Sequence, residues 1–181
     1  MVAKNIDTGD QTTTYTYGTT LTDSDVARND LLVSVAYPDS TGSSDTVSTT
    51  YNGLGQRRTV TDQRGCVHTY EYDKLGQQVE DKVTTTGSGV DNHVLRIQRQ
   101  YEVRGLVEKV TSHSATSGGS VRNEVQREYN GFGQLTREWQ EHGGAVNTGA
   151  SPSVQYSYAS GDVSGTQTNQ FFSDSPLSPR L

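Results

Sequence analysis

The fold of this chain is decided by residues 61–77, which read TDQRGCVHTYEYDKLGQ. Two turn signals, Asp62-x-x-Gly65 and Asp73-x-x-Gly76, enclose a run whose side chains alternate between two faces, as those of a half-buried strand do. An aspartate that opens a turn can accept backbone hydrogen bonds, and a glycine three residues later can close a type I turn with a bulge. The stretch therefore predicts strands joined by tight turns.

The second of these turns belongs to a repeated motif, Tyr-x-x-x-Gly. Its four copies begin at Tyr51, Tyr72, Tyr101 and Tyr129 and end at Gly55, Gly76, Gly105 and Gly133. The intervals between successive tyrosines are 21, 29 and 28 residues, and Tyr158 follows after another 29. A motif in fixed register predicts one supersecondary unit with a variable loop. The loops near Thr84–Asn92, Ser112–Ser120 and His142–Pro152 account for the longer form.

The whole chain is expected to be all-β, an open strip of repeated antiparallel hairpins. Threonine, valine and tyrosine recur throughout, as they do in strands, and the one weak helix candidate is Ser24–Leu32. Tyr15-Thr16-Tyr17 indicates an incomplete unit before the four clear copies. We predict an N-terminal lead over residues 1–11, a repeat region over 12–161 and a loosely held tail over 162–181.

The strand faces can be assigned for the later repeats. From Val121 to Tyr129, the apolar and aromatic residues share one face, and the other face carries Arg122, Glu124, Gln126 and Glu128. This alternation is typical of a half-buried strand. Each motif tyrosine is expected to pack against the next repeat, because cross-strand aromatic contacts stabilise sheets.

Composition excludes several classes of protein. Only 30% of the residues are apolar, which suits thin repeats that each bury one face. The formal net charge of -6 and the lack of a basic run argue against nucleic acid as a partner. The single cysteine, Cys66, excludes an intrachain disulfide. No signal peptide and no membrane-spanning stretch is visible in the sequence.

The repeats resemble the YD repeat of the Rhs family, which also occurs in teneurins and in the shell components of bacterial toxin complexes. The resemblance covers residues 12–161, and residues 61–77 carry both of the family's turns. It implies a long antiparallel strip that coils into a hollow shell, without enzymatic activity, in secreted or cell-surface proteins that enclose or display a partner or toxin domain. The Asp-Pro pair that ends the family's core does not occur here. We therefore expect a fragment of a larger protein.

Partners implied by this interpretation are flanking repeats or further copies of the chain, joined through exposed edge strands. The alternative function is a carbohydrate-binding surface module. In that case exposed aromatic residues, Trp139 and Tyr156, would stack on sugar rings.

No catalytic, cofactor-binding or metal-binding residue is assigned. Asp7-Thr8-Gly9 spells an aspartic protease triplet, but it lacks apolar flanks and a partner triplet. Cys66 and His68 share a strand face without a third ligand nearby in sequence. The acidic stretches at Asp23–Asp25 and Asp39–Thr41 lack a calcium-loop pattern, and no pattern places Glu138 and Glu141 across a cleft.

Overall fold

The computed structural model describes residues 2–3, 11–38, 45–158 and 172–173. Strands joined by turns and loops make up this described part, which contains no helix. The Asp7-Thr8-Gly9 triplet and the stretch at Asp39–Thr41 lie outside it, as do most of the predicted lead and tail. The chain divides into two compact units, residues 1–95 and 96–181. This division falls inside the repeat region predicted for residues 12–161.

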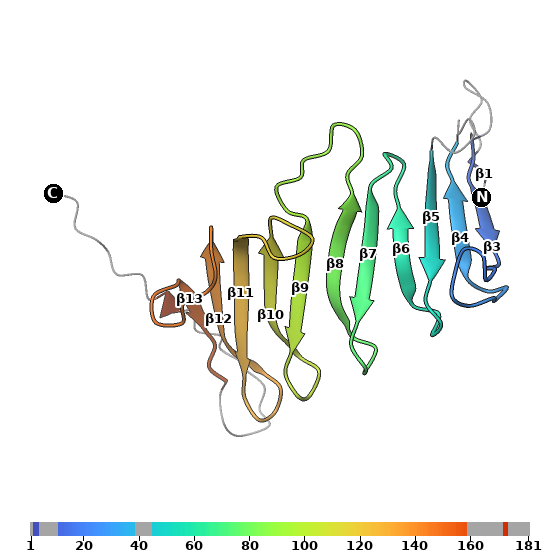
Figure 1. Ribbon diagram of the computed structural model, residues 1–181. Helices are drawn as coiled ribbons and strands as arrows, with labels where there is room; N and C mark the ends of the chain where they lie inside the picture. The colour runs from blue at the N-terminus through green and yellow to red at the C-terminus, as the bar shows by residue number, and fades with distance from the viewer. Residues whose placement is uncertain (1, 4–10, 39–44, 159–171, 174–181) are drawn as a thin grey trace. The chain divides into compact units, whose positions relative to one another are not determined.

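The first unit contains a short antiparallel pair and a larger antiparallel sheet (Figure 1). The pair joins β1 (Val2–Ala3) to β2 (Gln11–Thr12). The larger sheet runs in chain order through β3 (Thr14–Tyr17), β4 (Leu32–Ala36), β5 (Thr46–Tyr51), β6 (Arg57–Thr61), β7 (Val67–Tyr72) and β8 (Gln78–Thr85). Each strand pairs antiparallel with the next, so every connection is a hairpin.

The second unit repeats this arrangement. Its strands are β9 (Arg96–Tyr101), β10 (Val107–His113), β11 (Val121–Tyr129), β12 (Leu135–His142), β13 (Ser153–Gln155) and β14 (Phe172–Ser173). Neighbours in sequence are again antiparallel neighbours in the sheet. The outermost strands of a unit do not pair with each other, so neither sheet is closed. The prediction of an open, all-β strip of hairpins is confirmed; its coiling into a shell stays a prediction.

The tight turns have the predicted chemistry. The sheet register shifts beside each motif tyrosine, which is the bulge expected next to such a turn. Gly55, Gly76, Gly105 and Gly133 have φ between 79° and 86°, and Gly65 in the intervening turn has φ 79°. This left-handed conformation strains any residue with a Cβ, so the spacing of glycines in the sequence follows from backbone sterics.

In the first unit, the loop between β3 and β4 covers the end of β5. The Tyr51 amide donates to Ser24 Oγ at 3.1 Å, and the Asp25 amide donates to the Tyr51 carbonyl at 2.9 Å. Thr19 Oγ1 ties the loop to itself by donating to the Val26 carbonyl at 2.6 Å. The expectation of an all-β chain holds at the one weak helix candidate, Ser24–Leu32, because residues 24–31 contain bends and turns and Leu32 begins β4.

In the second unit, the loop of residues 143–152 covers one face of β11 and β12. Its Val146 amide donates to Glu124 Oε1 at 3.0 Å, and its Thr148 carbonyl accepts a 3.2 Å hydrogen bond from Trp139 Nε1. Glu124 is therefore 5% exposed. Strand alternation in the sequence shows which residues share a face with Glu124 but not which loop covers that face.

Candidate functional site

Tyr51, Tyr72, Tyr129 and the later Tyr158 form a ladder of hydrogen bonds, two in each unit. In the first unit, Tyr51 Oη donates to the Leu32 carbonyl at 2.7 Å and Tyr72 Oη donates to the Arg57 carbonyl at 2.9 Å. In the second unit, Tyr129 Oη and Tyr158 Oη each donate at 2.8 Å, to the carbonyls of Val107 and Leu135. Each acceptor is the first residue of a strand: β4 for Tyr51, β6 for Tyr72, β10 for Tyr129 and β12 for Tyr158.

The acceptors follow a rule that links consecutive repeats. Arg57 lies opposite Tyr51 in the sheet register, so Tyr72 binds the residue paired with the preceding motif tyrosine. By the same rule Tyr51 binds Leu32, which lies opposite Tyr17. Tyr17 thus occupies the first position of the ladder in the first unit. It belongs to the outermost strand of that sheet, and it is 58% exposed where Tyr51 is 7% exposed.

Side chains of the turns add a second set of links along the same edge. Gln56 Nε2 donates to the Gly76 carbonyl at 3.0 Å in the first unit, and Arg104 Nη1 donates to the Asn130 carbonyl at 2.7 Å in the second. Each bond joins one tyrosine turn to the next. These side-chain bonds, neutral for Gln56 and charge-assisted for Arg104, hold neighbouring turns in register in addition to the backbone hydrogen bonds of the sheet.

The Asn or Asp that opens a tight turn stabilises that turn. Asp73 Oδ1 accepts from the Leu75 and Gln77 amides at 2.9 Å, and Asp62, Asn52 and Asn130 make the same pair of bonds. Glu102 departs from this pattern. Its carboxylate binds Arg104 Nε at 2.9 Å, the same arginine that reaches the following turn.

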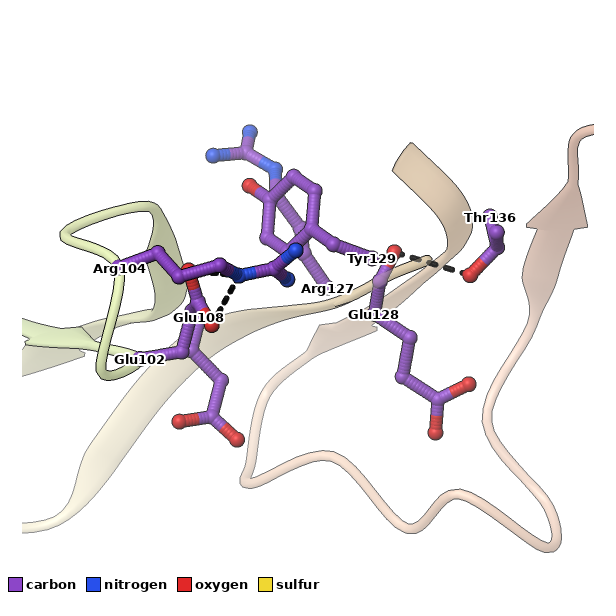
Figure 2. A pocket seen from close by; sticks show the side chains of 7 residues that line it. All are labelled: Glu102, Arg104, Glu108, Arg127, Glu128, Tyr129 and Thr136. Atoms are coloured by element: carbon purple, nitrogen blue, oxygen red, sulfur yellow. Dashed lines mark hydrogen bonds and ion pairs between the residues drawn. The ribbon is translucent and has the colours of Figure 1, made fainter. Parts of the chain in front are cut away.

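A hollow with a cavity volume of about 290 Å³ lies beside this exceptional turn (Figure 2). Its lining residues are Glu102, Arg104, Glu108, Arg127, Glu128, Tyr129 and Thr136. Arg127 Nε binds Glu138 Oε2 at 2.7 Å, and this hydrogen bond raises the pKa of Arg127 despite partial burial. Thr136 Oγ1 donates to the Glu128 carbonyl at 3.1 Å. The cations and hydroxyls of the hollow thus bind neighbouring groups of the sheet, while Glu108 and Glu128 are exposed.

Glu124 is the centre of a buried polar network on β10 and β11. Thr111 Oγ1 donates to its Oε2 at 2.7 Å, the Val146 amide donates to Oε1, and Lys109 Nζ lies 3.2 Å from Oε1. Burial alone would raise the pKa of Glu124, but these hydrogen bonds and the charge of Lys109 outweigh it and lower the pKa. The network fixes the covering loop to the sheet in the charged state of Glu124.

The two residues proposed for sugar stacking are placed differently. Trp139 is 3% exposed, and the Arg137 guanidinium carbon lies 4.8 Å from its ring centroid. The expectation that Trp139 is an exposed platform is wrong, because the loop of residues 143–152 and Arg137 cover the ring. Tyr156 is half-buried, with its amide bound to the Thr136 carbonyl at 2.8 Å. Sugar binding stays a prediction, and no feature of Trp139 supports it.

The remaining chemical groups weighed from the sequence also have structural partners. Cys66 is buried and its Sγ accepts from the Gly87 amide at 3.1 Å, whereas His68 Nδ1 lies 2.7 Å from Asp81 Oδ1. Within the described ranges, no group of three or more His, Cys, Asp or Glu residues is arranged to hold a metal ion. Asp25 pairs with Arg58 at 2.7 Å.

Glu138 and Glu141 are not a catalytic pair across a cleft. They lie on opposite faces of β12, where Glu138 binds Arg127 and Glu141 Oε2 accepts from Ser151 Oγ at 2.5 Å. The Ser151 contact could not be predicted from the sequence, because it depends on how the covering loop folds.

Comparison with solved structures shows where this fold occurs. A chain in the crystal structure of TcdB2-TccC3-TEV aligns with 82% of this chain at a TM-score of 0.56 and 14% identity, over 6% of its own length. A chain of TcdB2-TccC3-Cdc42 aligns with 72% of this chain at a TM-score of 0.31 and 16% identity, over 8% of its length. At such identities the first likeness shows the fold alone, and the chain spans a small part of the structures it matches.

No protein-family model matches the sequence, and neither does any curated protein. Among the described residues, no helix long and apolar enough to cross a membrane occurs. The fold and the tyrosine ladder are therefore the findings on which a functional proposal can rest.

Proposed function

We propose that this chain is a non-enzymatic structural segment of an Rhs-like, YD-repeat shell, in which successive hairpins add to a strip that encloses or displays a partner. The fold likeness to a chain of TcdB2-TccC3-TEV supports such a scaffold. The resemblance of residues 61–77 to the YD repeat supports the same class. By that resemblance, the parent protein is secreted or lies at the cell surface.

The observation that carries the proposal is the position of Tyr17. It ends β3 with a register shift like that beside the motif tyrosines, yet β4 is the only described strand that pairs with β3. All four residues of β3 are exposed. An outermost strand presents unpaired backbone groups to a further strand, and Tyr17 Oη would then donate to the carbonyl of that strand's first residue.

The partner of this edge is a strand of the same repeat type. In a longer protein it comes from a flanking repeat, and for the isolated chain it comes from a second copy. Such head-to-tail addition is heterologous, so it extends the strip and need not stop at a dimer.

Sedimentation velocity over a range of protein concentrations tests the proposal. The chain should form oligomers whose size rises with concentration, and Thr16→Lys should keep it monomeric, because a lysine on the edge strand opposes strand addition. The control is Val103→Lys, which adds the same charge to a turn residue that is 100% exposed. A monomer at every concentration, or equal loss of association in both variants, would overturn the proposal.

A further inference from the structure

We propose that Asn52-Gly53 and Asn130-Gly131 are deamidation sites that the hydrogen bonds of their own turns keep unreactive. Two of the four tyrosine turns carry the pair Asn-Gly directly after the tyrosine, and the other two carry Asp73 or Glu102 at the asparagine position. The glycines that follow the asparagines are exposed. Because glycine has no Cβ, its backbone nitrogen can reach the side-chain amide of the preceding asparagine without steric hindrance.

The reaction consumes one water and releases one ammonia at each site. The glycine nitrogen loses its proton to hydroxide and attacks Cγ of the asparagine, so that a C–N bond forms. The bond from Cγ to Nδ2 then breaks, and Nδ2 takes a proton from water and leaves as ammonia, which returns the hydroxide. Water then opens the resulting five-membered imide at either carbonyl, which yields aspartate or isoaspartate. No electron transfer occurs, and each site gains one negative charge.

The turn holds the asparagine amide away from this reaction. Asn130 Oδ1 accepts from the Phe132 and Gln134 amides, both at 3.0 Å, and Asn130 Nδ2 donates to Gln134 Oε1 at 2.8 Å. Asn52 makes the equivalent three bonds at 3.0, 2.9 and 2.9 Å. Attack on Cγ requires the amide to turn toward the glycine nitrogen and to break these bonds. The reaction therefore proceeds through local opening of the turn.

The two products differ in their effect on the turn. Asp62 and Asp73 already occupy the equivalent position and accept the same two amide hydrogen bonds through Oδ1. Conversion of Asn130 to aspartate thus yields a turn that the repeat already uses. Isoaspartate instead adds a methylene to the backbone inside a turn whose register is fixed by the sheet, so this product disrupts the turn.

The two sites are not equally protected. A Cβ placed on Gly131 would meet no atom within 4 Å, whereas one on Gly53 would lie 4.0 Å from the Asp25 carbonyl. The loop that contains Asp25 also holds both backbone groups of Tyr51. The turn at Asn52 is therefore held by the whole loop between β3 and β4, whereas the turn at Asn130 is held from outside by the Arg104 side chain on the Asn130 carbonyl. Because one side chain is displaced more easily than a hydrogen-bonded loop, we expect Asn130 to react first.

Peptide mapping by mass spectrometry after incubation at mildly alkaline pH tests these rates. In native buffer Asn130 should deamidate faster than Asn52, and in concentrated urea both rates should rise by about tenfold or more and become similar. Equal rates in native buffer and in urea would overturn the proposal, because the turn would then give no protection.

Two variants separate the turn's hydrogen bonds from general exposure. Gln134→Ala removes the acceptor of Asn130 Nδ2, so it should speed deamidation at Asn130 in native buffer and leave Asn52 unchanged. Gly131→Ala, for which the structure has room, should slow the reaction at Asn130 in native buffer and in urea alike. An unchanged rate in both variants contradicts the proposal. If Gln134→Ala fails to fold, the comparison of wild type with and without urea still decides.

Discussion

The hydroxyl of Tyr72 donates a 2.9 Å hydrogen bond to the carbonyl of Arg57, the residue that lies opposite Tyr51 in the sheet. One tyrosine thus connects its own repeat to the turn of the repeat before it. Because the same relation recurs at Tyr51, Tyr129 and Tyr158, it is a property of the repeat and not of one position.

Replacing Tyr72 by phenylalanine tests this relation. Tyr72→Phe keeps the ring but leaves the Arg57 carbonyl without its donor, so it should reduce the free energy of unfolding by about 1 kcal/mol. Urea denaturation measures the change. The matched control is Tyr17→Phe at a concentration where the chain is monomeric, which should change stability by less than about 0.5 kcal/mol. Equal effects of the two variants would show that the hydroxyl bond does not stabilise the repeat.

The carboxylate of Asp73 should be replaceable by an amide but not by a methyl group. Asp73→Asn keeps the Oδ1 acceptor that Asn52 and Asn130 use, so its stability should stay within about 0.5 kcal/mol of wild type. Asp73→Ala loses two hydrogen bonds to turn amides and should cost about 1–2 kcal/mol. Thermal unfolding of the two variants checks the difference. A cost for Asn equal to that for Ala would mean that charge, and not the acceptor, stabilises the turn.

Glu124 should make the second unit sensitive to acid. Its pKa is lowered below the ordinary value of 4.5, so its contribution to stability is fully present above that pH and is lost as the pH falls through the lowered pKa. Glu124→Gln should cost about 1–2 kcal/mol at neutral pH, because the Lys109 contact loses its charge. The difference in melting temperature between wild type and variant should shrink on acidification. A constant difference from neutral to acidic pH would contradict the assigned network.

Removing the Trp139 ring should reduce the free energy of unfolding far more than removing the exposed ring of Phe132. Trp139→Ala removes a ring that is buried and in contact with Arg137, and should cost about 3–5 kcal/mol. Phe132→Ala, at a turn residue that is 93% exposed, should have an effect below about 0.5 kcal/mol. Chemical denaturation followed by circular dichroism compares them. Similar costs would mean that the loop over Trp139 is not held in place in solution.

Features that depend on local chemistry, such as the tight turns, could be predicted from the sequence. Asp73 and Gly76 specify a turn because one accepts backbone hydrogen bonds and the other adopts positive φ, and neither effect depends on distant residues. The hairpin fold follows once these turns recur. The same reasoning found the motif tyrosines, but it could not find their acceptors, because Arg57 and Val107 are identified only by the sheet register.

Features that depend on loops were missed or wrongly placed. Trp139 was assigned to an exposed position, but Trp139 and Glu124 are both buried because residues 143–152 fold over that face. A loop rich in Gly, Ser and Thr has no periodicity that would predict which strand it covers. The departure at Glu102 was visible in the sequence, but its ion pair with Arg104 was not predicted.

Amide hydrogen exchange of β3, measured at low and high protein concentration, tests the central claim most directly. If the edge of β3 receives a further repeat strand, exchange of the Thr14–Tyr17 amides should slow as concentration rises, while the exposed turn at Val103 should not change. Exchange of β3 that stays equally fast while oligomers form would contradict the claim, because association would then use another surface.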